Sequence, residues 1–131
     1  MEYILYFDGC CKGNPGPGGS GSVLYKNNEE IQIYKLYLPK TTNNIAEYTG
    51  LLIGLNGAIE LNIKKLLVRG DSKLVISQLN GDYTVKSENL KGLYKQIKEL
   101  EKHFDIIKYE HVYRKDNSRA DELSNNAFNL L

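Results

Sequence analysis

The order of apolar patterns along the chain constrains its fold more than any other feature of the sequence. Three runs rich in apolar and aromatic residues come first and are typical of strands, and the apolar spacing then changes at residue 43 to that of a helix face. The three strands are expected at 2–9, 20–26 and 29–38, followed by a helix at 44–61, a strand at 64–70, a short helix opening at Asp71, a helix at 88–102, a strand at 105–114 and a helix at 117–130. This order predicts an α/β domain with a mixed sheet, in which the first three strands form an antiparallel meander.

Length and composition are those of one ordinary globular domain. The 131 residues suffice for one core and are too few for two domains of usual size, so we expect a single domain over residues 1–131. A net charge of +1 argues weakly against a nucleic-acid partner, because phosphate binding uses clustered lysine and arginine. Cys10 and Cys11 are adjacent and have no other cysteine to pair with, which indicates a reducing compartment. With neither a signal-peptide pattern nor an apolar run of membrane length, we expect a soluble protein that is cytoplasmic or otherwise intracellular.

The stretch "DGCCKGNPGPGGSG" at residues 8–21 resembles two phosphate-binding motifs and satisfies neither. Gly16, Gly18 and Gly21 have the spacing of a dinucleotide-binding fingerprint, but a strand-like run follows them where that motif requires a helix. A Walker-type loop needs its lysine at the other end of the motif. We therefore interpret the stretch as a wide turn between antiparallel strands.

Four acidic residues each have an ordinary structural explanation when they are considered alone. Asp8 can be a turn residue, Asp71 can cap the short helix, and Glu47 and Asp121 can belong to capping arrangements with Asn44 and Ser118.

Taken together, the same acids indicate a common site. Asp8 and Asp71 both follow apolar strands, so parallel pairing of those strands would place the two carboxylates at one edge of the sheet, where α/β proteins bind ligands. Gly50, Gly54 and Gly57 share the face of Glu47 in the long helix, and each costs about 1 kcal/mol relative to alanine. Close approach of this face to the sheet near Asp8 would explain that cost.

Converging carboxylates repel one another unless a cation holds them. A set of oxygen ligands without a cluster of histidine or cysteine suits Mg²⁺ or Mn²⁺ better than Zn²⁺. Two such ions about 4 Å apart can activate water and stabilise a leaving oxygen in phosphodiester hydrolysis. The sequence therefore predicts metal-dependent phosphoryl chemistry.

Four segments carry a resemblance to the type 1 ribonuclease H family over nearly the whole chain. These are "YFDGCCKGNPGPGG", "TTNNIAEY", "RGDSKLV" and "NSRADELS", in the order and approximate spacing of that family. The resemblance implies a ribonuclease H-like fold, with a five-stranded mixed sheet flanked by helices. It also implies an endoribonuclease that hydrolyses the RNA strand of RNA/DNA hybrids and leaves 5′-phosphate and 3′-hydroxyl ends.

The resemblance also assigns roles to individual residues. It implies that Asp8 bridges two Mg²⁺ ions, with Mn²⁺ as an alternative metal, that Asp71 and Glu47 bind one ion, and that Asp121 binds the other. Residues implied to contact the hybrid are Cys11, Asn14, Asn43 and Asn44, together with Thr42 for a DNA phosphate. Helix capping is the alternative role for Asn43 and Asn44. We expect the enzyme to act as a monomer on an RNA/DNA hybrid, with no membrane partner.

The sequence departs from the family pattern in two places. Many members carry a histidine in the loop before the last acid, whereas this loop reads "YRKDNSRAD" and resembles a subgroup without it. We expect Arg114 to lie near the scissile phosphate, and His111 and His103 to be structural. The connection at 80–92 is too short for the basic protrusion of some members. Lysines 86, 91, 95 and 98 are partial substitutes or simply a solvated helix face, so we expect weaker, salt-sensitive binding.

Two other functions remain open at this point. The fold can hold a hybrid or a protein partner without cutting it, a role that loss of one of the four acids would favour. Alternatively, the nuclease chemistry acts on double-stranded RNA or on RNA–DNA junctions.

Overall fold

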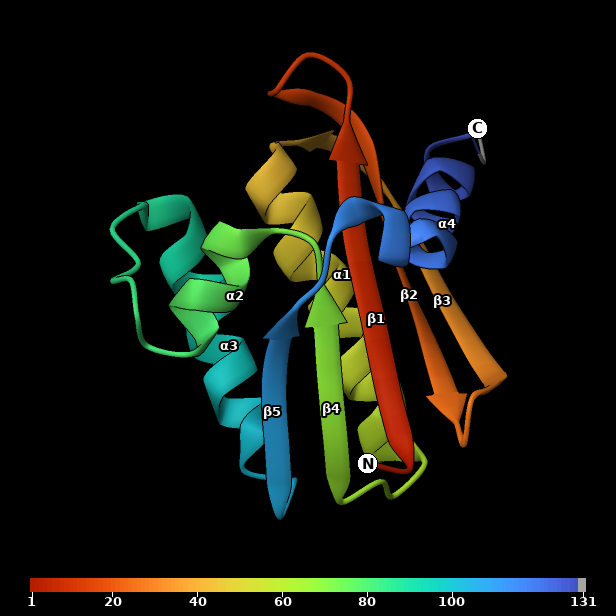
Figure 1. Cartoon of the computed structure of the whole chain (residues 1–131). Coiled ribbons are helices and arrows are strands. Elements are labelled where there is room, and N and C mark those ends of the chain that lie inside the picture. Colours follow the sequence, from red (N-terminus) through yellow and green to blue (C-terminus); the bar gives the residue numbers. More distant parts are fainter. Residues whose placement is uncertain (130–131) are drawn as a thin grey trace.

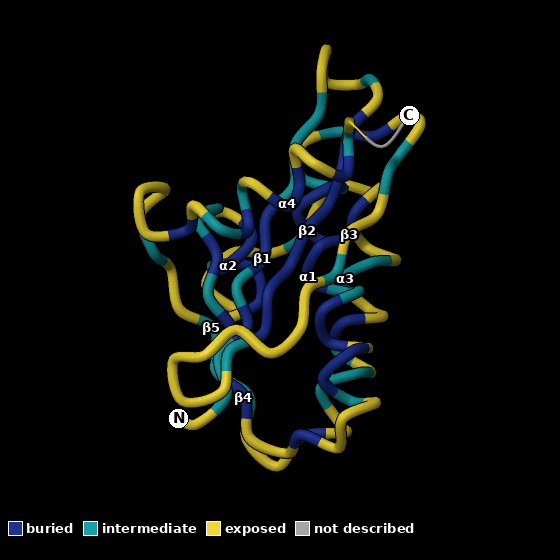
Figure 2. Tube along the Cα trace, turned by 90° about the vertical axis from the view of Figure 1, so that its right-hand side faces the viewer, coloured by how far each residue is buried: buried dark blue, intermediate teal, exposed yellow. Residues whose placement is uncertain are grey.

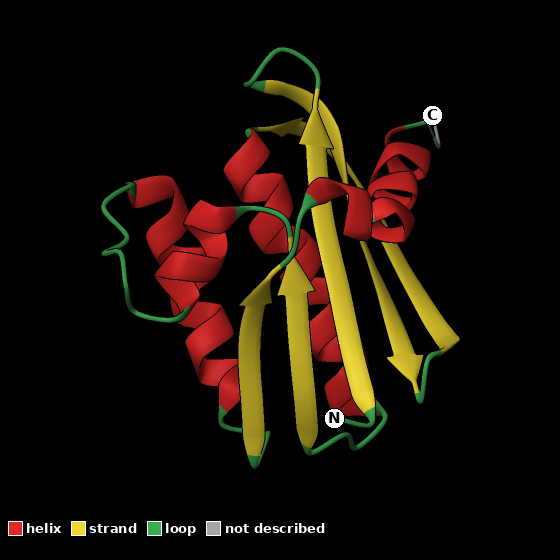
Figure 3. Cartoon of the chain, in the orientation of Figure 1, coloured by secondary structure: helices red, strands yellow, loops and turns green. Residues whose placement is uncertain are grey.

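The computed structural model describes residues 1–129 and contains one five-stranded sheet. The strands are β1 (Tyr3–Cys11), β2 (Gly16–Lys26), β3 (Glu29–Thr41), β4 (Lys65–Gly70) and β5 (Ile106–His111). The helices are α1 (Asn43–Glu60), α2 (Lys73–Leu79), α3 (Glu88–Glu101) and α4 (Ser118–Phe128), and a 3₁₀ turn, η1 (Arg114–Asp116), precedes α4. The elements follow the expected order, and Figure 3 shows their distribution.

The sheet is mixed and has the strand order β3-β2-β1-β4-β5. β1, β2 and β3 pair antiparallel as consecutive neighbours, while β1–β4 and β4–β5 are parallel pairs. The expected antiparallel meander and five-stranded mixed sheet are therefore confirmed. The parallel pairs bring the ends of β1 and β4 to the same part of the molecule (Figure 1).

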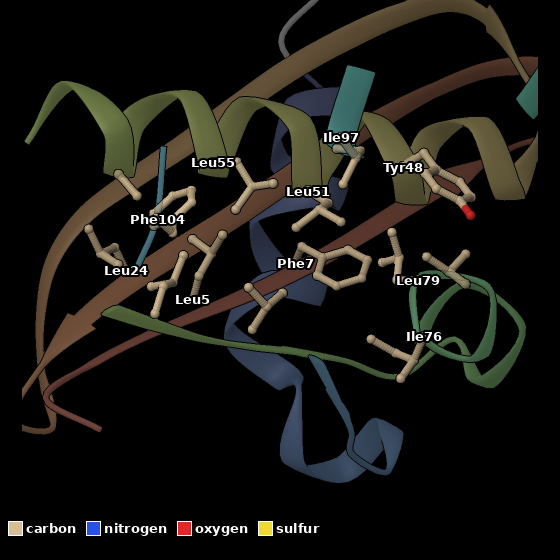
Figure 4. Close-up of a cluster of buried hydrophobic side chains, with 14 of the residues drawn as sticks. Leu5, Phe7, Leu24, Tyr48, Leu51, Leu55, Ile76, Leu79, Ile97 and Phe104 are labelled. Atoms are coloured by element: carbon tan, nitrogen blue, oxygen red, sulfur yellow. The ribbon is translucent and has the colours of Figure 1, made fainter. Parts of the chain in front are cut away.

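Helices cover both faces of this sheet. α1, α2 and α3 pack on one face, and α4 lies on the opposite face against β2, β1 and β3 (Figure 1). Figure 2 shows buried positions along the central strands and on the sheet-facing side of α1. The core between α1 and the sheet includes Leu5, Phe7, Leu51 and Leu55, which point toward one another in Figure 4.

Two helix starts differ from the sequence-based expectation. The side chain of Thr42 accepts a hydrogen bond from Ile45 N and caps α1, so neither Asn44 nor Glu47 forms the capping arrangement. Ser72, rather than Asp71, caps α2 by accepting from Val75 N. A nearby hydroxyl supplies the cap in both cases, which leaves the acids available for other contacts.

The interpretation of residues 8–21 as a wide turn is wrong in its extent. β1 continues to Cys11 and β2 begins at Gly16, so the turn itself covers only residues 12–15. Gly13 has a φ of 84° and supplies the left-handed conformation there. Gly19 and Gly21 are strand residues, and a Cβ at either position would lie within 2.6 Å of the α4 backbone. Their small size, rather than their backbone freedom, lets α4 pack closely on β2.

The C-terminal elements are shorter than expected. β5 ends at His111 because the chain turns at Arg114–Asp116 before α4 begins. α4 ends at Phe128, and residue 130 of the expected helix lies outside the described residues. No helix within residues 1–129 has the length and hydropathy needed to cross a membrane.

Candidate active site

The parallel register of β1 and β4 brings two of the predicted acids together. Phe7 pairs with Gly70, so the next residues, Asp8 and Asp71, are neighbours across the two strands. Asp8 is not a turn residue, because it lies within β1 and pairs with Gly21 of β2. Because Asp8 lies on a central strand, it is buried, with only 5% of the residue exposed.

Close packing of α1 on β1 positions the third acid, Glu47. A Cβ on Gly9 would lie 2.2 Å from the Ala46 carbonyl carbon and 2.4 Å from Glu47 N. A Cβ on Gly50 would lie 2.5 Å from Asp8 O. Glycine is therefore required on both the strand and the helix, and this close approach leaves Glu47 buried beside Asp8.

Asp8, Glu47 and Asp71 form a compact carboxylate cluster. Each offers one oxygen, and these oxygens all lie within 4.8 Å of one another. The cluster lies in a pocket of about 490 Å³, whose wall includes Asp121 from α4 and Arg114 from η1. The fourth predicted acid thus borders the pocket without belonging to the compact cluster.

Burial and mutual repulsion perturb the ionisation of this cluster. Desolvation is the main cause that raises the pKa of Asp8 from 3.8 to about 7, and the negative charge of Asp71 also raises it. The pKa of Glu47 is raised well above its usual value, first by burial and then by Asp8. Neither shift has a positively charged side chain among its causes, although Arg114 borders the pocket.

The cluster has the properties of a site for a hard divalent cation. Glu47 Oε2 is buried without a hydrogen-bond partner in the described part of the chain, and an unsatisfied buried acceptor is costly. The carboxylate oxygens come from β1, α1 and the connection between β4 and α2, and Mg²⁺ and Mn²⁺ prefer oxygen ligands of this type. A bound cation would satisfy Glu47 Oε2 and offset the repulsion among the acids.

The predicted substrate contacts lie beside this pocket. A second hollow of about 290 Å³ is lined by Asn14, Thr42, Asn43 and Asn44, together with Ser87, Asn89 and Leu90 at the start of α3. Asn43 also borders the acidic pocket, as does Cys11, whose thiol lies 3.2 Å from Asn43 Oδ1. Asn14 Oδ1 accepts a hydrogen bond from Asn43 N, which fixes the β1–β2 turn against the start of α1.

The histidines and lysines differ in their relation to the site. Neither His103 nor His111 borders the acidic pocket within residues 1–129, and the His111 ring packs edge-on against Tyr113 at 5.7 Å. Lys98 donates to Leu79 O at 2.8 Å, and Lys91 pairs with Glu88 on the same helix. These two lysines are therefore less available to a substrate than their sequence pattern indicates.

Two asparagines near the pocket were missed from the sequence. Asn117 donates from Nδ2 to Phe7 O and to Asp71 Oδ2, and Asn125 donates to the Asp121 carboxylate. Cys10 also borders the pocket. Among these contacts, only the one between Asn125 and Asp121 could be expected from the sequence, because residues four apart on a helix are neighbours.

The fold and the pocket together define an α/β protein with a cluster of carboxylates, suited to a metal ion, at the carboxyl edge of its sheet. Residues 6–127 match the family described as reverse transcriptase-like. The bifunctional protein Rv2228c of Mycobacterium tuberculosis is 40% identical over 97% of this chain, which spans only 35% of that protein. A ribonuclease H of Pseudomonas fluorescens is 35% identical, with 92% of this chain and 86% of that protein covered.

A solved structure agrees with the sequence comparisons. LC11-RNase H1 in complex with an RNA/DNA hybrid superposes with a TM-score of 0.92 at 33% identity and covers 97% of this chain and 96% of that chain. The chain belongs to the type 1 ribonuclease H family.

Proposed function

We propose that this chain is a metal-dependent endoribonuclease that hydrolyses the RNA strand of RNA/DNA hybrids and leaves 5′-phosphate and 3′-hydroxyl ends. The observation that carries the proposal is the cluster of Asp8, Glu47 and Asp71, whose oxygens lie within 4.8 Å of one another in an open pocket. Membership of the ribonuclease H family and the likeness to a hybrid-bound relative support the substrate.

The four carboxylates divide between two cations in this proposal. Asp8, Glu47 and Asp71 would hold one Mg²⁺, and Asp8 and Asp121 would hold the second, with Mn²⁺ as a possible substitute. When bound, the cations supply an activated water nucleophile and stabilise the departing 3′ oxygen. All four acids come from one chain, so we propose a monomer as the active unit.

The neighbouring hollow would orient the hybrid relative to the acids. Thr42 would bind a phosphate of the DNA strand, while Cys11, Asn14, Asn43 and Asn44 would contact the minor groove, where 2′-hydroxyls distinguish RNA from DNA. Cys11 and Asn43 border the acidic pocket, so the route from the groove contacts to the acids is short. Arg114, on the pocket wall, would interact with the scissile phosphate.

Cleavage of matched substrates tests this function. End-labelled RNA would be incubated in an RNA/DNA duplex, in double-stranded RNA and as a single strand, beside a DNA duplex, each with Mg²⁺, Mn²⁺ or a chelator. Asp8→Asn is the inactive variant, and Asp82→Asn makes the same substitution at an exposed loop residue. We expect the wild type and Asp82→Asn to cut the RNA of the hybrid when a divalent metal is present. We expect Asp8→Asn to leave it intact, and none of the proteins to cut the other substrates.

Other outcomes have defined meanings. Hybrid binding without cutting would replace the enzyme with a binding module. Preferential cutting of double-stranded RNA would keep the nuclease chemistry and overturn the proposed substrate.

A further inference from the structure

Asn117 is a buried residue that contacts the acidic site from the connection between β5 and α4. Figure 1 shows this connection crossing in front of β1 before α4 begins. Asn117 lies between η1 and α4, and only 1% of it is exposed. Its side chain therefore reaches the interior at the point where three elements of the site meet.

The two hydrogen bonds of the Asn117 amide determine its orientation. Nδ2 donates to Phe7 O at 3.0 Å and to Asp71 Oδ2 at 3.2 Å. Both partners are acceptors only, so the reversed amide would place an oxygen against two oxygens. The observed orientation leaves Oδ1 buried without a partner in the described chain. An unsatisfied buried acceptor is unfavourable, so the two donated bonds must outweigh it.

Asn117 connects three of the four acids. Phe7 O belongs to the residue immediately before Asp8, and the second hydrogen bond ends on the carboxylate of Asp71. The backbone oxygen of Asn117 accepts from Asp121 N at 3.1 Å, within the first turn of α4. One residue thereby links the strand of Asp8, the side chain of Asp71 and the backbone of Asp121.

We propose that Asn117 is a positioning residue that orients the Asp71 carboxylate toward Asp8 and so sets the affinity of the site for divalent cations. The inference rests on the proposed metal site. A carboxylate ligand held by a donor outside the metal's own ligands loses less freedom when the cation binds. Asn125 makes an analogous contact to Asp121 but is exposed, so water can replace its donor, and its effect would be smaller.

Metal binding by three variants tests this role without any substrate. Asn117→Ala removes both donors, Asn117→Ser retains a single hydroxyl donor, and Asn126→Ala is a control at an exposed position of α4. Binding of Mn²⁺ and Mg²⁺ is measured by titration calorimetry, and thermal unfolding of the metal-free proteins is followed in parallel. We expect Asn117→Ala to bind about 10- to 100-fold more weakly, Asn117→Ser to lie between it and the wild type, and Asn126→Ala to match the wild type.

A purely structural role would give a different pattern. Asn117→Ala with a lower melting temperature and wild-type metal affinity would overturn the inference. If Asn117→Ala does not fold, Asn117→Ser decides, and wild-type affinity in that variant has the same meaning. A wild type that binds cations in an Asn117-dependent way but leaves hybrids intact would contradict the proposed function alone. Hybrid cleavage together with unchanged metal affinity in Asn117→Ala would contradict this inference alone.

Discussion

Asp8 and Glu47 are carboxylic acids in surroundings that disfavour their charged forms. Both residues are more than nine-tenths buried, and their oxygens share a small space with that of Asp71. Folding of the metal-free protein therefore raises the pKa of both carboxyl groups and favours their neutral forms. The free energy for assembling the cluster comes from the surrounding core and from close packing of α1 on β1.

The raised pKa of Asp8 predicts how stability depends on pH. Between about pH 4 and pH 7 the folded protein keeps a proton on Asp8 that the unfolded chain has lost, so the free energy of unfolding falls as the pH rises. A shift from 3.8 to about 7 corresponds to a loss on the order of 4 kcal/mol from this group. Urea unfolding of the chelator-treated protein at several pH values measures the effect.

Two controls isolate the contribution of Asp8. Asp8→Asn should reduce the pH dependence, with a remainder from Glu47, whose own burial raises its pKa, and saturating Mg²⁺ should flatten it for the wild type. Metal-free stability that stays constant or increases from pH 4 to pH 7 would contradict the description of the cluster.

Arg114 has a separate prediction, because it borders the pocket without being a carboxylate ligand. Replacing it with alanine should lower the single-turnover cleavage rate about 10- to 100-fold, because the guanidinium group would no longer stabilise the negative charge that develops at the scissile phosphate. Metal affinity should not change. Arg114→Lys should retain part of the rate, because lysine keeps the charge without the planar fork.

Lys115→Ala is the control for Arg114, since Lys115 lies beside it in η1 and does not border the pocket. Equal rates for Arg114→Ala and Lys115→Ala would remove Arg114 from the mechanism.

At the scale of elements, the contact between α1 and β1 links stability to the site. A methyl group at Gly50 would lie 2.5 Å from Asp8 O and 3.1 Å from Gly21 O, so α1 would have to move. We expect Gly50→Ala to lower the free energy of unfolding by about 1–3 kcal/mol despite its better helix propensity. Metal affinity should fall as well, because Glu47 lies on the displaced helix.

Gly92→Ala is the matched control in α3, where a Cβ would meet nothing within 4 Å. This variant should be more stable by up to about 1 kcal/mol with unchanged metal affinity. Urea unfolding and calorimetry give both quantities. A Gly50→Ala protein as stable as Gly92→Ala would show that close packing does not position Glu47.

The elements and the acidic cluster were largely accessible from the sequence for a physical reason. The spacing of apolar residues follows which side of a helix or strand is buried, so the elements could be predicted from it. Parallel pairing of two apolar strands places Asp8 and Asp71 together, so the acidic cluster could be predicted as well. The extent of β1 and β2 was not accessible, because residues 16–21 have the composition of a turn, yet they pair with the neighbouring strands, and Gly19 and Gly21 pack closely against α4. Asn117 belongs to the segment "NSRADELS", but its contacts were not accessible, since its partners lie 46 and 110 residues away.

At the scale of the whole molecule, the site depends on docking of the C-terminal helix. α4 lies on the face of the sheet opposite α1, and Arg119 pairs with Glu30 of β3 at 2.8 Å (Figure 1). Asp121 and Asn125 reach the pocket, and Asn117 reaches Asp71, only when this helix is in place. The pocket thus combines Asp8, from the first strand, with Asp121 and Asn125, from the last helix.

The charge distribution predicts how hybrid binding responds to salt. Lys86 is exposed and precedes Ser87, which lines the hollow beside the acidic pocket. If Lys86 neutralises one phosphate, Lys86→Ala should weaken binding and reduce the slope of log K against log salt by about 0.9. Fluorescence anisotropy with a labelled hybrid, in Ca²⁺ and at several salt concentrations, measures this slope.

Lys102→Ala is the control for Lys86, because Lys102 follows the far end of α3 and pairs with Glu99. It should leave the slope unchanged. An equal reduction in both variants would indicate a diffuse effect of net charge rather than a contact at Lys86.

The most direct measurement for the whole account is the single-turnover rate of hybrid cleavage as a function of Mg²⁺ concentration for the wild type, Asp8→Asn and Asp82→Asn. We predict that the wild type and Asp82→Asn share one saturating Mg²⁺ dependence, and that Asp8→Asn is slower by roughly 1,000-fold or more at every concentration. Cleavage that persists in Asp8→Asn, or that proceeds in the absence of divalent cations, would contradict the assignment of the carboxylate cluster as the catalytic metal site.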